Sequence, residues 1–90
     1  MAAPTFELQV ITPQGMPYKA RVVHTRVPID GGYVGILANH AAYIVSSLGG
    51  RLDVREADGA EKTFSVGAGF FEVNKNQAIF LTQHFTGSNS

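Results

Sequence analysis

The chain has 90 residues, no cysteine and a formal net charge of zero, since seven basic side chains balance seven acidic ones. Charged residues make up only 16% of the sequence, so we do not expect the clustered basic surface that binds nucleic acid or an anionic membrane. The absence of cysteine excludes disulfides and argues against a zinc ribbon or finger. The amino terminus lacks a leader pattern, and no apolar run approaches the roughly 20 residues that cross a bilayer. We therefore expect one small soluble domain without a membrane-spanning segment.

The first half of the chain alternates apolar and polar residues with a period of two, which predicts short β-strands. Segment 5–12 places three apolar side chains on one face, and a Pro-Gln-Gly turn follows it at residues 13–15. In segment 20–27 the alternation predicts one face of Val23, Thr25 and Val27 and an opposite face of Val22, His24 and Arg26. Segment 39–47 could form a turn or two of helix, but its Tyr-Ile-Val run favours a strand.

The second half alternates in the same way and is divided by turns. Leu52 and Val54 are the expected inward residues of one strand, and Asp58-Gly59 predicts a hairpin because glycine tolerates the positive φ of a primed turn. Two further strands flank a turn at residues 74–76, and the core is expected to include Phe6, Phe64 and Phe80. The sequence predicts an all-β fold, an antiparallel β-sandwich of about eight to ten short strands in two sheets. We expect this single domain to cover residues 1–85, followed by a polar, frayed tail over residues 86–90.

The glycine-rich segment 31–35 does not fit a phosphate-binding loop. A Walker-type loop continues from its last glycine into Lys and Ser or Thr, whereas Gly35 is followed by Ile36 and Leu37. Gly67 and Gly69 continue into a strand instead of opening a helix, so a dinucleotide loop is also disfavoured. We interpret these glycines as turns, bends or close approaches of the backbone.

The histidines and serines offer no recognisable catalytic or metal-binding pattern. The three histidines, His24, His40 and His84, lie far apart, and no carboxylate stands at metal-ligand spacing beside His40. No serine lies in a Gly-x-Ser-x-Gly context. We therefore expect no catalytic, cofactor-binding or metal-binding residue.

Two adjacent rings, Phe70 and Phe71, must point to opposite faces of their predicted strand. One ring can enter the core, and the other would mark a contact surface. We assign Phe71 to the contact surface as a candidate for partner binding.

Four segments carry a resemblance to a known family: ELQVITPQG, VPIDGGYVGILANHAAYI, GGRLDVRE and FSVGAGFFEVNKNQAIFLT. In this order they resemble the amino-terminal β-sandwich domain of the epsilon subunit of the F-type ATP synthase, over residues 6–83. The chain departs from the family pattern at Tyr33, where many members carry an acidic residue, and at Ala38 and Ala42, near which prolines are usual. It also has Gly-Ala-Gly at residues 67–69, where a Gly-Gly pair is common.

The resemblance implies a rotor subunit in the central stalk of a proton- or sodium-driven ATP synthase, with no bond chemistry and no cofactor of its own. The implied partners are the gamma subunit and the polar loops of the c-ring, with no nucleic acid. Other subunits would hold the chain at the cytoplasmic face of a bacterial plasma membrane. Carried over by position, the expected contact residues are Asp30, Gly31, Gly32, Tyr33, Gly35 and His40, in addition to Phe71.

Typical members continue into a carboxy-terminal helical hairpin that restrains ATP hydrolysis and, in some, binds ATP, whereas this chain stops at Ser90. We therefore expect the 90-residue protein neither to inhibit hydrolysis by helix insertion nor to bind ATP. Without the resemblance, the main alternative is a stand-alone carbohydrate- or peptide-binding β-sandwich, although the absence of tryptophan argues against carbohydrate. An enzyme is the more distant alternative.

Overall fold

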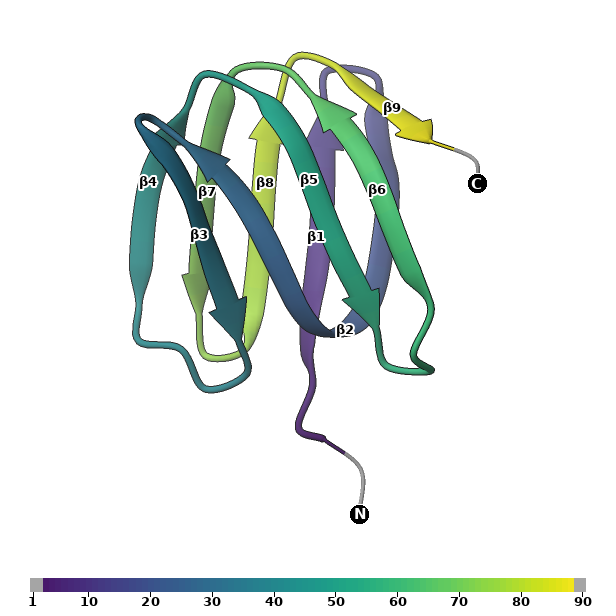
Figure 1. The fold of residues 1–90 in the computed structure, drawn as a ribbon. Helices are drawn as coiled ribbons and strands as arrows, with labels where there is room; N and C mark the ends of the chain where they lie inside the picture. The colour runs from purple at the N-terminus through teal and green to yellow at the C-terminus, as the bar shows by residue number, and fades with distance from the viewer. Residues whose placement is uncertain (1–2, 89–90) are drawn as a thin grey trace.

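The computed structural model describes residues 3–88 and consists of strands joined by short turns (Figure 1). The strands are β1 (Phe6–Thr12), β2 (Gly15–Ile29), β3 (Gly32–Leu37), β4 (Tyr43–Ser47), β5 (Gly50–Glu56), β6 (Glu61–Val66), β7 (Gly69–Asn74), β8 (Gln77–Thr82) and β9 (Phe85–Ser88). The prediction of an all-β fold with eight to ten strands is confirmed. Within residues 3–88 there is no helix that could cross a membrane.

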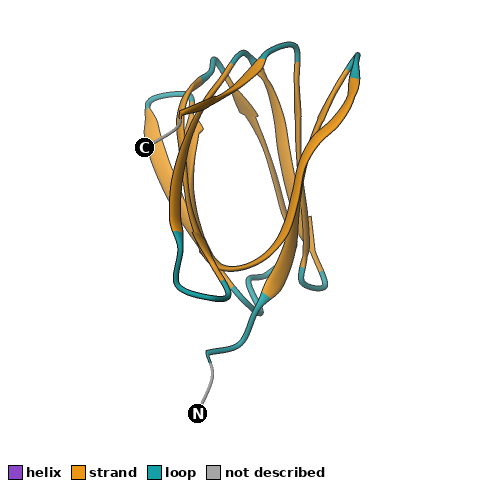
Figure 2. Ribbon diagram, turned by 90° about the vertical axis from the view of Figure 1, so that its right-hand side faces the viewer, coloured by secondary structure: helices purple, strands orange, loops and turns teal. Residues whose placement is uncertain are grey.

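All nine strands belong to one continuous mixed sheet, in the order β4-β7-β8-β1-β2-β5-β6-β9, with β3 paired to β2. Strand β2 is 15 residues long, and it pairs first with β1 and then with β3 and β5. Figure 2 shows that the sheet curls into two facing layers, and β2 is the strand that belongs to both. The prediction of two wholly antiparallel sheets is therefore wrong in detail, because β2 joins the layers and β1 runs parallel to β8.

A β-bulge in β2 changes which side chains face the core. The register between β2 and β5 shifts between Val22 and His24, so one extra residue, Val23, stands in the strand. Val22 is fully buried, and so are Thr25 and Val27. The predicted alternation is correct for Thr25 and Val27 but wrong for Val22. The extra residue, Val23, shifts the alternation, so that Val22 points into the core on the same side as Thr25 and Val27.

The core lies between the two layers and takes side chains from both. Fourteen hydrophobic residues are buried in one cluster: Phe6, Leu8, Val10, Val22, Val27, Ile36, Leu52, Val54, Phe64, Val66, Phe71, Val73, Ala78 and Phe80. The expected core rings of Phe6, Phe64 and Phe80 are among them, as are Leu52 and Val54. The fully buried hydroxyl of Thr25 is satisfied because it donates to the Asp53 carbonyl at 2.9 Å.

The predicted turns are present, but the one at Asp58-Gly59 is not a primed two-residue turn, because only Gly59 has a positive φ, of 94°, and the loop spans residues 57–60. Residues 13–14 join β1 to β2, and the Asp58-Gly59 hairpin joins β5 to β6. Between β7 and β8, Lys75 and Asn76 both have positive φ, 51° and 61°, as a primed two-residue turn requires. Residues 86–88 of the expected frayed tail pair with β6 as part of β9, and residues 89–90 of that tail lie outside the described part.

Candidate functional site

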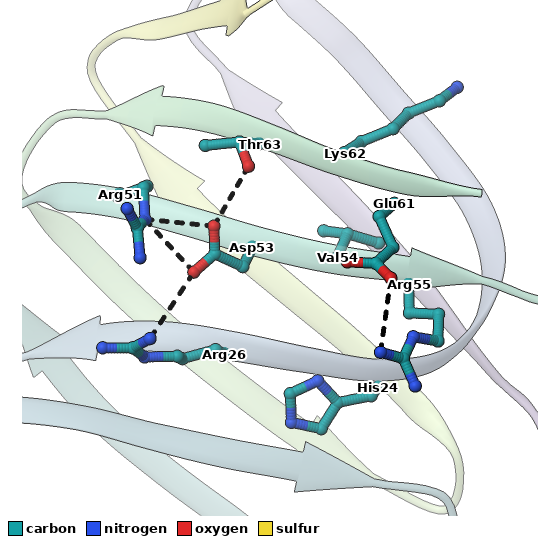
Figure 3. A pocket seen from close by; sticks show the side chains of 9 residues that line it. All are labelled: His24, Arg26, Arg51, Asp53, Val54, Arg55, Glu61, Lys62 and Thr63. Carbon is teal, nitrogen blue, oxygen red and sulfur yellow. Dashed lines mark hydrogen bonds and ion pairs between the residues drawn. The ribbon is translucent and has the colours of Figure 1, made fainter. Parts of the chain in front are cut away.

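Polar side chains gather on the outer face of β2, β5 and β6 around a shallow hollow of about 420 Å³ (Figure 3). Asp53 lies at its centre, 3.1 Å from the Arg51 Nε and 3.9 Å from the Arg26 Nη1. The Thr63 hydroxyl also donates to Asp53, at 3.1 Å. Beside this group, one guanidinium nitrogen of Arg55 lies 3.4 Å from Glu61.

This hollow is a network of exposed ion pairs and has no catalytic arrangement. Both of its carboxylates, Asp53 and Glu61, are paired with arginines. His24 lines the same hollow (Figure 3), but within residues 3–88 no hydrogen bond joins its ring to a hydroxyl or a carboxylate. No cluster of three acidic or histidine side chains in that part of the chain is placed to hold a metal ion. Such exposed pairs contribute about 0–1 kcal/mol each to stability.

Tyr18 is a titratable group whose surroundings displace its pKa. Its hydroxyl donates to Glu56 at 2.6 Å, and Lys62 Nζ lies 3.3 Å from the same carboxylate oxygen. Its ring packs 4.7 Å from Phe64 and 6.4 Å from Phe85, measured between ring centroids. Burial of the phenol, followed by the hydrogen bond to Glu56 and its negative charge, raises the pKa of Tyr18 above its ordinary value.

We expect Tyr18 to make the folded protein sensitive to alkaline pH. The folded state holds the phenol protonated, whereas the unfolded chain releases the proton near the ordinary pKa of about 10. The contribution of Tyr18 is therefore complete below about pH 10 and is lost progressively as the pH rises further. We expect the free energy of unfolding, measured with urea, to fall less between about pH 8 and about pH 10.5 for Tyr18→Phe than for the parent.

The exposed Tyr33 supplies the control, since Tyr33→Phe removes a phenol without disturbing the Tyr18–Glu56 pair. If the parent and Tyr18→Phe lose the same stability above pH 10, the raised pKa of Tyr18 is not the cause of the alkaline sensitivity.

The predicted contact residues at the start of the glycine-rich segment do lie together, in the turn between β2 and β3. Gly31 and Gly32 have φ values of 87° and 154°, so the turn requires glycine there. Asp30 accepts a hydrogen bond from the Ser46 hydroxyl at 3.2 Å, which ties this turn to the end of β4. Tyr33 is 47% exposed, and the Arg26 guanidinium lies 4.2 Å from the centre of its ring.

Gly35 and His40 are not part of that turn. Gly35 lies within β3 opposite Arg26, where an added Cβ would approach His24 Nε2 to 3.2 Å. His40 lies beyond the other end of β3, with its Nδ1 2.7 Å from the Ala41 carbonyl and its ring 5.6 Å from that of Tyr43. Figure 1 shows the two turns at opposite ends of the molecule. The predicted contact segment is therefore divided into two separate surfaces.

Phe71 cannot serve as the outward contact ring. Its side chain is fully buried and packs 6.4 Å from Phe80 between ring centroids, whereas Phe70 is 58% exposed. The assignment of Phe71 to a partner surface is wrong, and Phe70 is the ring that points outward. The sequence contained the necessary signal, because Phe70 shares its strand face with the charged Glu72 and Phe71 shares its face with Val73.

Phe70 belongs to an apolar face on the outside of β1, β4, β7 and β8 that the sequence analysis missed. Phe70 lies directly opposite Leu81 in β8, and Leu81 lies opposite Ile11 in β1, so the three side chains form a row across the sheet. Ile44 of β4 is 69% exposed on the same layer, and Leu48 just beyond β4 is 80% exposed. We call Ile11, Ile44, Phe70 and Leu81 the apolar face. Exposed apolar groups gathered in this way are typical of a surface that binds another protein.

The fold defines a small all-β domain made of one curled sheet, with a row of apolar side chains on its outer side. Residues 5–87 match the family described as "ATP synthase, Delta/Epsilon chain, beta-sandwich domain". Because this match spans nearly all of the chain, the protein belongs to the family of ATP synthase delta/epsilon chains, and the resemblance found in the sequence is confirmed.

Curated relatives carry the same description. The ATP synthase epsilon chain of Chlorobaculum tepidum is 32% identical over 78 residues, which cover 87% of this chain and 89% of the relative. The ATP synthase epsilon chain of Leptospira interrogans is 39% identical over 85 residues, or 93% of this chain. The match spans only 65% of that Leptospira chain.

Solved structures show the same fold at low sequence identity. A chain of the Euglena gracilis mitochondrial ATP synthase, in a structure of its OSCP, F1 and c-ring, superposes with a TM-score of 0.86 and 19% identity over 97% of this chain and 56% of its own. A chain from the central stalk and c-ring of the Tetrahymena thermophila mitochondrial enzyme gives a TM-score of 0.76 and 15% identity, over 96% of this chain and 69% of its own.

Proposed function

We propose that this chain is a non-catalytic subunit of the central stalk of an ATP synthase, where it links the gamma subunit to the c-ring. The family match over residues 5–87 carries the proposal. The structural relatives, which come from assemblies that contain F1, a central stalk and a c-ring, support it. In this role the chain is held at the membrane by other subunits, and it couples rotation without breaking or forming bonds.

A linking subunit needs two separate surfaces, and this molecule offers two of different chemistry. The row of Phe70, Leu81 and Ile11 in the apolar face suits the centre of a permanent interface, because such a centre is depleted of charge. The exposed Glu72 opposite Ile44 would lie at its rim. We assign the apolar face to gamma. The turn between β2 and β3 is exposed, with Asp30 and Gly31 at its tip and the exposed Tyr33 close by in β3. Its chemistry suits the polar loops of the c-ring, to which we assign it.

Binding assays with the separate partners test both assignments. Leu81→Asp places a carboxylate in the row between Phe70 and Ile11, and should abolish measurable binding to purified gamma while the chain stays folded. Ser65→Asp is the matched control, since it adds the same charge to an exposed position on β6. Asp30→Lys should weaken capture by a gamma–c-ring complex but leave binding to isolated gamma unchanged.

Failure of the parent chain to bind either gamma or the gamma–c-ring complex would refute the proposed function. If Leu81→Asp binds gamma as tightly as Ser65→Asp does, gamma uses another surface.

A further inference from the structure

Two asparagine side chains that lie 37 residues apart in sequence are joined across one end of the molecule. The backbone N–H of Asn39 donates to Asn76 Oδ1 at 2.6 Å. In return, the Asn76 side-chain amide donates to Asn39 Oδ1 at 3.1 Å. We call this pair the asparagine clasp. It connects the β3–β4 loop, residues 38–42, to the tight turn between β7 and β8.

Both asparagines of the clasp have an unusual backbone conformation. Asn39 and Asn76 have φ values of 66° and 61°, in the left-handed region that asparagine adopts more readily than most residues. Asn76 is fixed from a second direction, because its carbonyl accepts the Glu7 backbone N–H at 3.0 Å. The turn that holds Asn76 is thus attached to β1 as well as to β7 and β8, and it forms a firm anchor for the loop.

The loop held by this anchor borders the apolar face. It contains His40, whose ring lies 5.6 Å from Tyr43, and it continues directly into β4, which carries the exposed Ile44. A loop that is ordered before binding loses less conformational entropy when a partner arrives, so the same contacts give a tighter complex. Side chains of the clasp can therefore influence affinity without touching the partner.

We infer that the asparagine clasp holds the β3–β4 loop in its partner-binding conformation, with Asn76 acting as a positioning residue for the contact made by His40. This inference rests on the proposed function, in which the apolar face meets gamma, and it adds that the β3–β4 loop bordering that face meets gamma as well. It assigns a role to Asn76 that neither composition nor strand alternation indicates.

Replacement of Asn76 by glycine tests the inference. Asn76→Gly keeps a residue that tolerates positive φ but removes both side-chain hydrogen bonds of the clasp. Lys75→Gly is the matched control, since Lys75 is exposed in the same turn with a φ of 51°. We expect Asn76→Gly, but not Lys75→Gly, to speed exchange of the Asn39 amide hydrogen and to lower the amide order parameters of residues 38–42.

The second readout is binding to gamma, measured well below the unfolding temperature of every variant. Asn76→Gly should weaken binding about tenfold, while Lys75→Gly should bind like the parent. His40→Ala should weaken binding in the parent but have much less effect in the Asn76→Gly background, because a displaced loop no longer presents His40. If the clasp only stabilises the fold, Asn76→Gly should lower the free energy of unfolding. His40→Ala should then weaken binding to gamma by the same factor in the parent and in the Asn76→Gly variant.

The outcomes separate the two proposals. If the parent chain binds gamma and Asn76→Gly binds equally well, the positioning role is overturned and the proposed function stands. If the order parameters of residues 38–42 do not change, the clasp does not hold the loop and the inference fails. If the parent does not bind gamma, the proposed function fails, and the positioning role fails with it even where the loop dynamics change as expected.

Discussion

Replacing Phe71 with alanine should lower the free energy of unfolding by about 3–5 kcal/mol, whereas the same change at Phe70 should have little effect on stability. Phe71 is fully buried against Phe80, so its removal leaves a cavity between the two layers. A domain of this length is stabilised by only roughly 5–13 kcal/mol in total, so the loss is a large fraction of its stability. Urea unfolding, followed by circular dichroism, measures the difference directly.

Phe70→Ala is the matched control, because it removes the same ring from the next position of the same strand. Phe70 is 58% exposed, and the folded state gains little from it. Its proposed role is in the apolar face, so Phe70→Ala should weaken binding to gamma while unfolding near the parent midpoint. Similar unfolding midpoints for the two variants would show that the rings do not face as described.

Local patterns predicted most of the strands because each strand carries its own alternation and each turn its own residues. The turn at Lys75 and Asn76 is an example, since its backbone requirement depends on adjacent residues only. At Asp58-Gly59 the hairpin was predicted correctly, although its loop is longer than the primed turn expected there. The parallel pairing of β1 with β8 could not be found in this way. It joins strands separated by most of the chain, and no turn residue specifies it.

The bulge in β2 shows a second limit of the alternation. Strand alternation predicts faces correctly only while the register is unbroken, and the extra residue at Val23 brings Val22 into the core. The bulge lies where β2 leaves β1 and begins to pair with β3 and β5. It therefore reflects the curling of the whole sheet, which is a tertiary property.

The candidate contact residues were predicted to lie in one loop, whereas the structure places Asp30 and Gly31 in a turn, Gly35 inside β3 and His40 beyond it. Gly31 and His40 are close in sequence, yet β3 lies between them, and its 6 residues span about 20 Å at the usual rise per residue of a strand. Conversely, Asn39 and Asn76 meet in space although 37 residues separate them. Proximity in the sequence therefore joined two separate surfaces into one, and it gave no sign of the asparagine clasp.

Replacing Gly69 with alanine should be among the most damaging single-methyl changes in this chain. Gly69 begins β7 and pairs with Thr82, and a Cβ added there would clash with the Leu81 carbonyl oxygen and lie 2.8 Å from the carbonyl carbon. Both atoms belong to the backbone of β8, so the methyl group can be accommodated only if β7 and β8 separate. We expect the free energy of unfolding to fall by about 3–5 kcal/mol, measured by urea denaturation.

Gly67→Ala provides the control two residues earlier. A Cβ at Gly67 would meet its nearest atoms, in His84, at an ordinary contact distance of 3.4 Å, so no backbone has to move. Alanine also restricts the unfolded chain more than glycine does, which favours folding by about 0.4–1 kcal/mol where the native conformation suits it. Gly67→Ala should therefore unfold at or slightly above the parent midpoint. Equal midpoints for the two alanine variants would mean that β7 and β8 do not approach as closely at Gly69 as described. Because Phe70 follows Gly69 directly, that result would also remove support for the position of the apolar face.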